Sequence, residues 1–300
     1  MDKSKQAPHR CVLAMLDYGR RYGGPDNLPD LIIFLRRAAE SGDAEAQFLL
    51  GELYREKRFF LERAGIAELL LASSQEDHST GPREALRWFE MAAAQGHSDA
   101  AKLAGLMYIG NSGMQKDYSK AIKWLSVAAQ QDNPDAWFFM GQAYSKGWGV
   151  PRDTVEAARW FLRAAERGHS YAQGILATRY EKGIGVPADL QEALRWYQDA
   201  ARGGHFHSAF RLGCLYEEGD RVDQNYDEAQ GWFEQVVCRG IGPEKVHAMI
   251  RLGSIHQRGL AGVEDPAKAA DLYKRAHKYA GLFAKELIPL TRKYLDQMIP

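Results

Sequence analysis

Cysteine is scarce in this sequence. The chain of 300 residues has three, Cys11, Cys214 and Cys238. Their odd number and scattered spacing exclude a disulfide framework and the paired spacing of a zinc site. We interpret them as small buried apolar residues, which favours a reducing compartment. No motif in the sequence predicts a bound metal or any other cofactor.

An excess of charge of either sign is also lacking. The chain has 39 basic and 39 acidic residues, so its formal net charge is zero. A general nucleic-acid binder would show a basic excess. We therefore expect no nucleic-acid partner.

Long apolar runs are absent as well. The nearest candidate, residues 66–72, falls far short of the roughly 20 apolar residues of a membrane span. The first residues include basic side chains but no apolar core of a signal peptide. We expect a chain without a transmembrane segment that works in the cytoplasm, or in the periplasm if an export signal precedes this sequence.

What the sequence has instead is a period. Five tryptophans stand 36 residues apart, and an alanine precedes each of them by three residues. Other positions, which hold Gly, Ala or Tyr, keep the same interval. The periodic tryptophans are Trp88, Trp124, Trp160, Trp196 and Trp232. Self-similarity of this length indicates a repeat architecture.

Each repeat carries two helical patterns. In one copy, Ala157, Trp160, Phe161 and Ala164 have the spacing of a single apolar stripe on a helix, and a second stripe follows after Gly168. Glycine ends a helix well, and Asp189 with the glutamate three residues later has the spacing of a helix-capping box. One helical hairpin cannot bury its own stripe, so the next repeat must cover it.

The order of these residues is similar to a known repeat. Ala-x-x-x-Leu-Gly-x-x-Tyr, Gly-x-Gly-Val-x-x-Asp and Ala-x-x-Trp-Phe/Tyr-x-x-Ala-Ala-x-x-Gly together resemble the Sel1-like repeat, a relative of the tetratricopeptide repeat. The match is poorer at Asp132, where glycine is expected. The resemblance implies an all-α, right-handed α/α superhelical solenoid of about six to seven repeats. It also implies binding of a protein or peptide on the concave surface rather than catalysis.

The domain organisation follows from the period. We predict a single solenoid over residues 1–300, with an N-terminal half-repeat at about 8–22 and repeats from about 27 to 280. An insertion interrupts it at about 55–81, and four extra residues stand near 240–243. The last segment, about 281–298, departs from the period and is interpreted as a capping helix.

Residues that suggest an enzyme have weak contexts. Gly183-x-Gly185 lacks the third glycine and the preceding strand of a nucleotide loop. His97, His169 and His205 occupy one repeat position, so they are too far apart to share a metal. The pair His205-x-His207 has no third ligand near it, and we interpret Glu217, Glu218 and Asp220 as a solvated acidic turn. No catalytic or metal-binding residue is predicted.

Four basic residues precede four of the periodic tryptophans. They are Arg87, Lys123, Arg159 and Arg195, on the helix side opposite the apolar stripe. Two interpretations stay open. One is a solvated face with ion pairs to the glutamates three residues earlier. The other is a charged row that orients an acidic or mixed-charge partner.

Aromatic residues outside the period form a second group of candidates. Trp137 and Trp148 replace smaller residues of other copies, which fits either interface positions or local packing. Phe59 and Phe60 lie in the insertion, which either covers the stack or adds to a binding face.

We therefore expect a non-catalytic interaction scaffold with one protein or peptide partner. A narrower version is an inhibitor or immunity protein for one enzyme. The alternatives are a hydrolase with a pocket lined by His205, His207 and Glu217, and a regulator that binds a membrane surface through the apolar insertion. The sequence does not identify the partner or the oligomeric state.

Overall fold

The computed structural model describes residues 10–25, 27–55, 80–111 and 115–296 of the chain. Within these ranges the regular elements are helices, and none is a β-strand. This confirms the predicted all-α class of stacked helix–turn–helix repeats. No helix in the described ranges is long and apolar enough to cross a bilayer.

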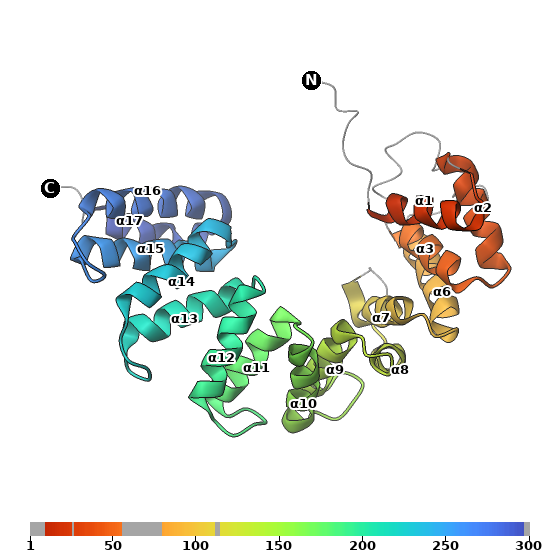
Figure 1. Cartoon of the computed structure of the whole chain (residues 1–300), viewed down its shortest axis with the longest axis horizontal. Coiled ribbons are helices and arrows are strands. Elements are labelled where there is room, and N and C mark those ends of the chain that lie inside the picture. Colours follow the sequence, from red (N-terminus) through yellow and green to blue (C-terminus); the bar gives the residue numbers. More distant parts are fainter. Residues whose placement is uncertain (1–9, 26, 56–79, 112–114, 297–300) are drawn as a thin grey trace. The chain divides into compact units, whose positions relative to one another are not determined.

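The chain divides into two compact units, residues 1–153 and 154–300 (Figure 1). The prediction of a single solenoid over residues 1–300, with its boundaries, stays a prediction. The insertion falls largely between residues 56 and 79, outside the described residues, and so do Phe59 and Phe60.

The first unit consists of helical hairpins in which each helix packs against its neighbours in the sequence. Its elements are α1 (Arg10–Tyr22), α2 (Leu28–Glu40), α3 (Ala44–Arg55), α6 (Thr80–Ala94), α7 (Ser98–Leu106), the π-helical turn η1 (Met107–Asn111), α8 (Tyr118–Ala129) and α9 (Pro134–Lys146).

The second unit continues the same alternation and ends in a helix, α17, that packs on α16. Its elements are α10 (Thr154–Glu166), α11 (Ser170–Lys182), α12 (Leu190–Arg202), α13 (Phe206–Glu218), α14 (Tyr226–Arg239), α15 (Pro243–Arg258), α16 (Pro266–Phe283), the 3₁₀ turn η2 (Lys285–Leu287) and α17 (Ile288–Asp296).

The helix ends follow the predicted signals. The Asp189 carboxylate accepts hydrogen bonds from the backbone N–H groups of Gln191 and Glu192, at 2.9 and 3.1 Å, and so caps α12. After α10 the chain turns at Gly168 with φ of 80°. Asp132 takes the same left-handed region with φ of 55°, which explains why other copies have glycine there.

The repeated tryptophans lie at the seams between hairpins, as the period predicts. Trp88, Trp124 and Trp196 are buried, and Trp160 and Trp232 are half-buried. The residue after Trp88, Trp124 and Trp232 faces a glycine of the hairpin before it. A Cβ on Gly213 would lie 2.5 Å from the Phe233 ring. These positions stay small because two backbones approach closely there.

Candidate partner-binding surface

The four residues Arg87, Lys123, Arg159 and Arg195, which we call the basic row, are all exposed. Arg87 on α6 and Lys123 on α8 belong to the first unit. Arg159 on α10 and Arg195 on α12 belong to the second. In each unit, two successive first helices of the hairpins therefore present a cation to solvent.

The ion pairs of the first interpretation of the basic row are present. Each arginine lies near the glutamate three residues before it, yet its side chain stays about two-thirds exposed. Exposed pairs of this kind contribute only a few tenths of a kcal/mol. An arginine can thus exchange its glutamate for another carboxylate at little cost. The distances between nitrogen and oxygen are 3.1 Å for Arg159–Glu156, 3.5 Å for Arg195–Glu192 and 3.9 Å for Arg87–Glu84.

Three cations of the basic row, Arg87, Lys123 and Arg195, also lie over the neighbouring indoles, whereas the cation over Trp160 is Arg163. The Lys123 Nζ is 4.8 Å from the centre of the Trp124 ring, and the Arg195 Cζ is 5.4 Å from that of Trp196. These distances are within the range of cation–π attraction. The tryptophan therefore fixes the hairpin seam on one side and orients the exposed cation on the other.

The indole N–H groups of the five repeated tryptophans differ in their hydrogen bonding. Trp124 Nε1 donates to Glu90 of the preceding first helix at 3.0 Å, and the Tyr108 hydroxyl donates to the same oxygen at 2.7 Å. The buried Nε1 atoms of Trp88, Trp160, Trp196 and Trp232 have no hydrogen-bond partner among the described residues. Of these five tryptophans, Trp124, at the seam between α6 and α8, is thus the one whose indole N–H has a hydrogen-bond acceptor among the described residues.

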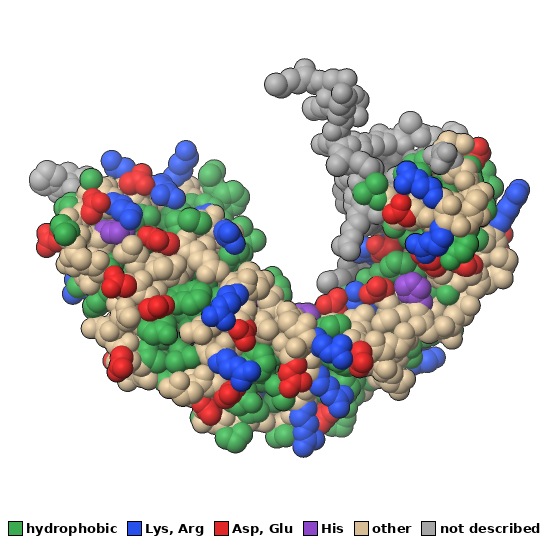
Figure 2. All heavy atoms as spheres, in the orientation of Figure 1, with side chains coloured by type: hydrophobic (Ala, Val, Ile, Leu, Met, Phe, Trp, Pro, Cys, Tyr) green, Lys and Arg blue, Asp and Glu red, His purple; other side chains and the backbone are tan. Residues whose placement is uncertain are grey.

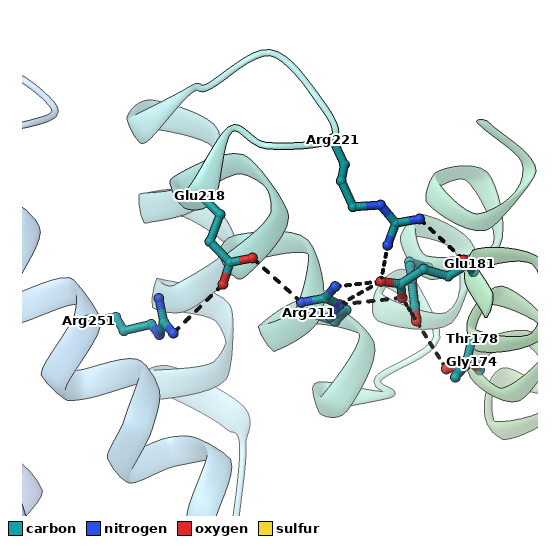
Figure 3. Close-up of polar contacts among 8 residues, drawn as sticks. Gly174, Thr178, Glu181, Arg211, Glu218, Arg221 and Arg251 are labelled. Carbon is teal, nitrogen blue, oxygen red and sulfur yellow. Dashed lines mark hydrogen bonds and ion pairs between the residues drawn. The ribbon is translucent and has the colours of Figure 1, made fainter. Parts of the chain in front are cut away.

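A second charged feature lies on the second helices of the hairpins (Figure 3). Glu181, at the end of α11, has a side chain only 4% exposed. It accepts hydrogen bonds from the Arg211 guanidinium on α13, from Arg221 at 2.8 Å and from the Tyr197 hydroxyl at 2.6 Å. Two arginines and a tyrosine therefore compensate one buried carboxylate.

One repeat later the same contact recurs. The Arg251 guanidinium on α15 donates to Glu217 of α13. Glu218 lies 3.9 Å from both Arg211 and Arg251, and so joins the two pairs. We call the set Glu181, Arg211, Glu217, Glu218 and Arg251 the ion-pair ladder. The interpretation of Glu217 and Glu218 as a solvated turn was wrong for Glu217, whose side chain is 19% exposed and bonded.

The contacts around Glu181 shift the pKa of Glu181 itself and of Tyr197. Burial acts to raise the pKa of Glu181, but the hydrogen bonds from Arg211 and Tyr197 and the charge of both arginines outweigh it and lower that pKa. Burial, with its bond to Glu181, raises the pKa of Tyr197. Glu181 is therefore ionised and committed to its partners, which is the state of a structural ion pair rather than of a general acid.

The repeated histidines cap helices. The Nδ1 atoms of His97 and His169 accept the N–H groups of Ala100 and Ala172, at 3.2 and 3.1 Å. Asn133 does the same in the copy between them, at 3.2 Å from Ala136. An imidazole that accepts at Nδ1 is neutral, and burial lowers the pKa of His97 accordingly.

His205 departs from this role. Its Nδ1 lies 2.7 Å from the Ser208 hydroxyl, and burial, with the nearby charge of His207, lowers its pKa to about 4. Its ring belongs to a row of edge-to-face contacts with Tyr171 and His207. Among the described residues no three His, Cys, Asp or Glu side chains gather as metal ligands would.

A hollow of about 320 Å³ lies elsewhere in the second unit. Its walls come from α14, α15, α16 and the turn before α16, and include Gln230, His256, Val263 and Lys268. His205, His207 and Glu217, the residues expected of a hydrolase pocket, do not line it.

Trp137 is not exposed. Its side chain is 6% accessible, and its Nε1 donates to the carbonyl of Ala129 at 2.9 Å. In other copies Gln47 and Gln173 make the equivalent bond, to Ala39 and Ala165. Trp137 thus replaces a glutamine in a structural contact between the two helices of a hairpin, and we leave it out of the candidate surface.

Trp148 is half-buried in the turn after α9. Its ring stacks on Tyr118 with centres 5.6 Å apart and planes 5° from parallel, and the Lys146 Nζ lies 4.6 Å from the ring centre. Local packing therefore accounts for much of this side chain, and its remaining surface lies within the first unit.

Comparison with protein families accounts for the period. The Sel1 repeat model matches residues 44–56, 76–97, 98–133, 134–169, 170–205, 207–240 and 246–276. The chain belongs to the Sel1 repeat family. Proteins built from Sel1 repeats are protein-interaction scaffolds.

Solved structures of other Sel1 repeat proteins are similar to the chain. One is c5321, a protective antigen present in uropathogenic Escherichia coli strains, with 28% identity and a TM-score of 0.76 over 96% of this chain. The chain spans 56% of the length of that protein. Another is a Sel1 repeat protein from Oxalobacter formigenes, with 28% identity and a TM-score of 0.66, covering 90% of this chain and 99% of that one.

A more distant structure is the immunity protein Pa5087 from Pseudomonas aeruginosa. It has 18% identity and a TM-score of 0.43, and covers 83% of this chain and 81% of that one. A search of the curated proteins gave no match.

Reasoning from the sequence missed the ion-pair ladder. The signal was present in the Sel1 repeat frame, because Arg211 and Arg251 stand where the two preceding copies have Phe139 and Ile175. An arginine at a position that is apolar in the neighbouring repeats indicates a buried acidic residue on the adjacent repeat. Glu181 supplies it.

Proposed function

We propose that this chain is a non-catalytic scaffold that holds one protein partner, and that the basic row makes the contact with acidic side chains of that partner. The single observation that carries the proposal is the geometry of the row. Each cation is exposed and is oriented by an indole or a glutamate. Exchange of that glutamate for a carboxylate of the partner costs little free energy.

The chemistry of the described residues supports binding rather than catalysis. Glu181 is held in ion pairs and His97 in a helix cap, and His205, His207 and Glu217 do not line the hollow in the second unit. A catalytic site needs such groups to converge on one open position. Charge complementarity of the row would mainly set the association rate and the specificity.

Affinity purification with the full chain as bait tests the proposal. We expect one stoichiometric protein partner whose association weakens as salt increases. In the variant Arg159→Glu/Arg195→Glu, binding should weaken by about tenfold or more, because two attractive contacts become repulsive.

A matched control places the same charges elsewhere on the second unit. Arg202→Glu/Lys274→Glu reverses two exposed cations outside the row and should leave affinity unchanged. Equal affinities of the wild type and both variants, measured by calorimetry on folded proteins, would remove the row from the interface. Identification of the captured protein would also decide whether the chain inhibits one enzyme.

A further inference from the structure

The turn between α14 and α15, residues 240–242, carries an exposed apolar side chain. The four residues that interrupt the period lie in the helices on either side of it, because α14 has 14 residues and α15 has 16. The tip of the turn, Ile241, is 76% exposed. The other hairpins of this unit have connections of the same length, residues 167–169 and 203–205, with glycine in the middle. An exposed isoleucine at a place where the other hairpins have glycine therefore needs a reason outside the packing of the repeats.

The turn is held against the end of α16. The backbone N–H of Gly242 donates to the Tyr279 hydroxyl at 3.2 Å, and the Tyr279 ring lies 4.8 Å from that of Phe283. Phe283 is 67% exposed, and Leu282 beside it is 65% exposed. Ile241, Leu282 and Phe283 thus gather at one end of the unit, and we call them the apolar tip. Figure 2 shows hydrophobic side chains at this end of α16 with Lys and Arg beside them.

Basic residues outnumber acidic ones in the segments that carry the apolar tip. The Lys245 Nζ lies 5.4 Å from the Tyr279 ring centre, and Arg239, Lys278 and Lys285 are exposed. Seven residues between 266 and 296 are basic and three are acidic, although the whole chain is neutral. Two acidic residues adjoin Lys245 and Lys285 in the same segments. They are Glu244, whose Oε1 is 3.5 Å from His207 Nδ1, and the exposed Glu286.

We propose that the apolar tip inserts into the interface of an anionic lipid bilayer, with the basic residues of these segments on the lipid headgroups. The three side chains are largely exposed and are not among those that line the hollow of this unit, whereas a peptide anchor would need a pocket to fill. The hollow of this unit lies at the opposite end of α15, beside His256. Exposed apolar residues and nearby cations are the two features that together hold a protein on an anionic membrane.

A second copy of this chain fits the surface less well. Two identical basic faces repel one another, so dimerisation through the apolar tip would bring the positive charges together. The basic side chains therefore favour a negatively charged partner. The exposed apolar side chains favour a lipid surface over a peptide that fills a groove.

Vesicle flotation with the full chain tests the proposal. We expect the protein to float with vesicles of phosphatidylcholine that contain about a third phosphatidylglycerol, and not with pure phosphatidylcholine. Binding should weaken as salt increases. The variant Ile241→Ser/Phe283→Ser should partition about tenfold less, because it loses apolar side chains from the interface.

The control variant is Val263→Ser, which removes a side chain that is 90% exposed at the other end of α15. It should float like the wild type, and circular dichroism should confirm that both variants are folded. A separate variant, Ile241→Trp, should show a blue shift of its fluorescence with anionic vesicles. Failure of the wild type to float, or equal flotation of the Ile241→Ser/Phe283→Ser variant, would overturn the proposal.

Discussion

Arg211 of α13 donates to the buried carboxylate of Glu181 on α11, and Arg251 of α15 repeats this contact with Glu217. The two contacts span 30 and 34 residues, and the difference equals the four residues by which α14 and α15 together exceed α12 and α13. The repeat frame thus places an ion pair at the same point of two successive interfaces.

Loss of the buried acid should destabilise the second unit. Glu181→Ala leaves the guanidinium of Arg211 and the hydroxyl of Tyr197 without their acceptor. We expect a decrease of about 2–4 kcal/mol in the free energy of unfolding, below the full value of a buried pair because both arginines are partly exposed. Urea unfolding measures it.

A control variant and a double-mutant cycle test the contact between Glu181 and Arg211. Asp271→Ala removes an exposed partner of Arg275 and should cost less than about 0.5 kcal/mol. A double-mutant cycle with Arg211→Ala should give a coupling of about 1–3 kcal/mol. A coupling near zero would mean that the contact contributes nothing to folding.

Substitution of Trp137 should unfold the hairpin rather than weaken a partner. Trp137→Ala removes a buried ring and the bond to Ala129, and should cost about 3–5 kcal/mol. Trp137→Gln should cost less, because Gln47 and Gln173 make the same bond in other copies. Thermal unfolding ranks the three proteins, and equal stability of both variants would contradict this role.

Stability should fall on acidification because of His205. Its pKa is about 4 when folded and about 6.5 in an unfolded chain, so the unfolded state binds the proton more readily. The contribution is complete above about pH 6.5 and is lost as the pH falls toward 4. In the variant His205→Asn, the decrease of Tm between about pH 6.5 and 4 should be smaller by a few degrees. An unchanged slope between these pH values would contradict the assignment.

Gly231 offers a stabilising change. It lies inside α14, is exposed, and a Cβ there would meet no atom of the described chain within 4 Å. Gly231→Ala should raise the free energy of unfolding by about 0.5–1 kcal/mol through helix propensity. The matched control is Gly213→Ala in α13, where the added Cβ would lie 2.5 Å from Phe233 and should destabilise. Similar changes in the free energy of unfolding of Gly231→Ala and Gly213→Ala would contradict this explanation by helix propensity and close packing.

Much of the fold could be predicted because its signal is periodic. The interval between Trp88 and Trp124 already locates the helices and their ends, since each repeat meets the same packing requirement. The candidate surface was harder to predict. The basic row was visible because it repeats, but the exposure of Trp137 depended on a hydrogen bond that its residue type does not reveal.

The sequence by itself determined the architecture of this protein, because helical periodicity, capping residues and a fixed repeat all act within neighbouring segments. Only the tertiary structure decided that Glu181 meets two arginines, that Trp137 substitutes for a glutamine, and that Ile241 lies near Phe283. Those contacts join residues of different helices and turns. Their energies depend on burial and direction, which no local pattern specifies.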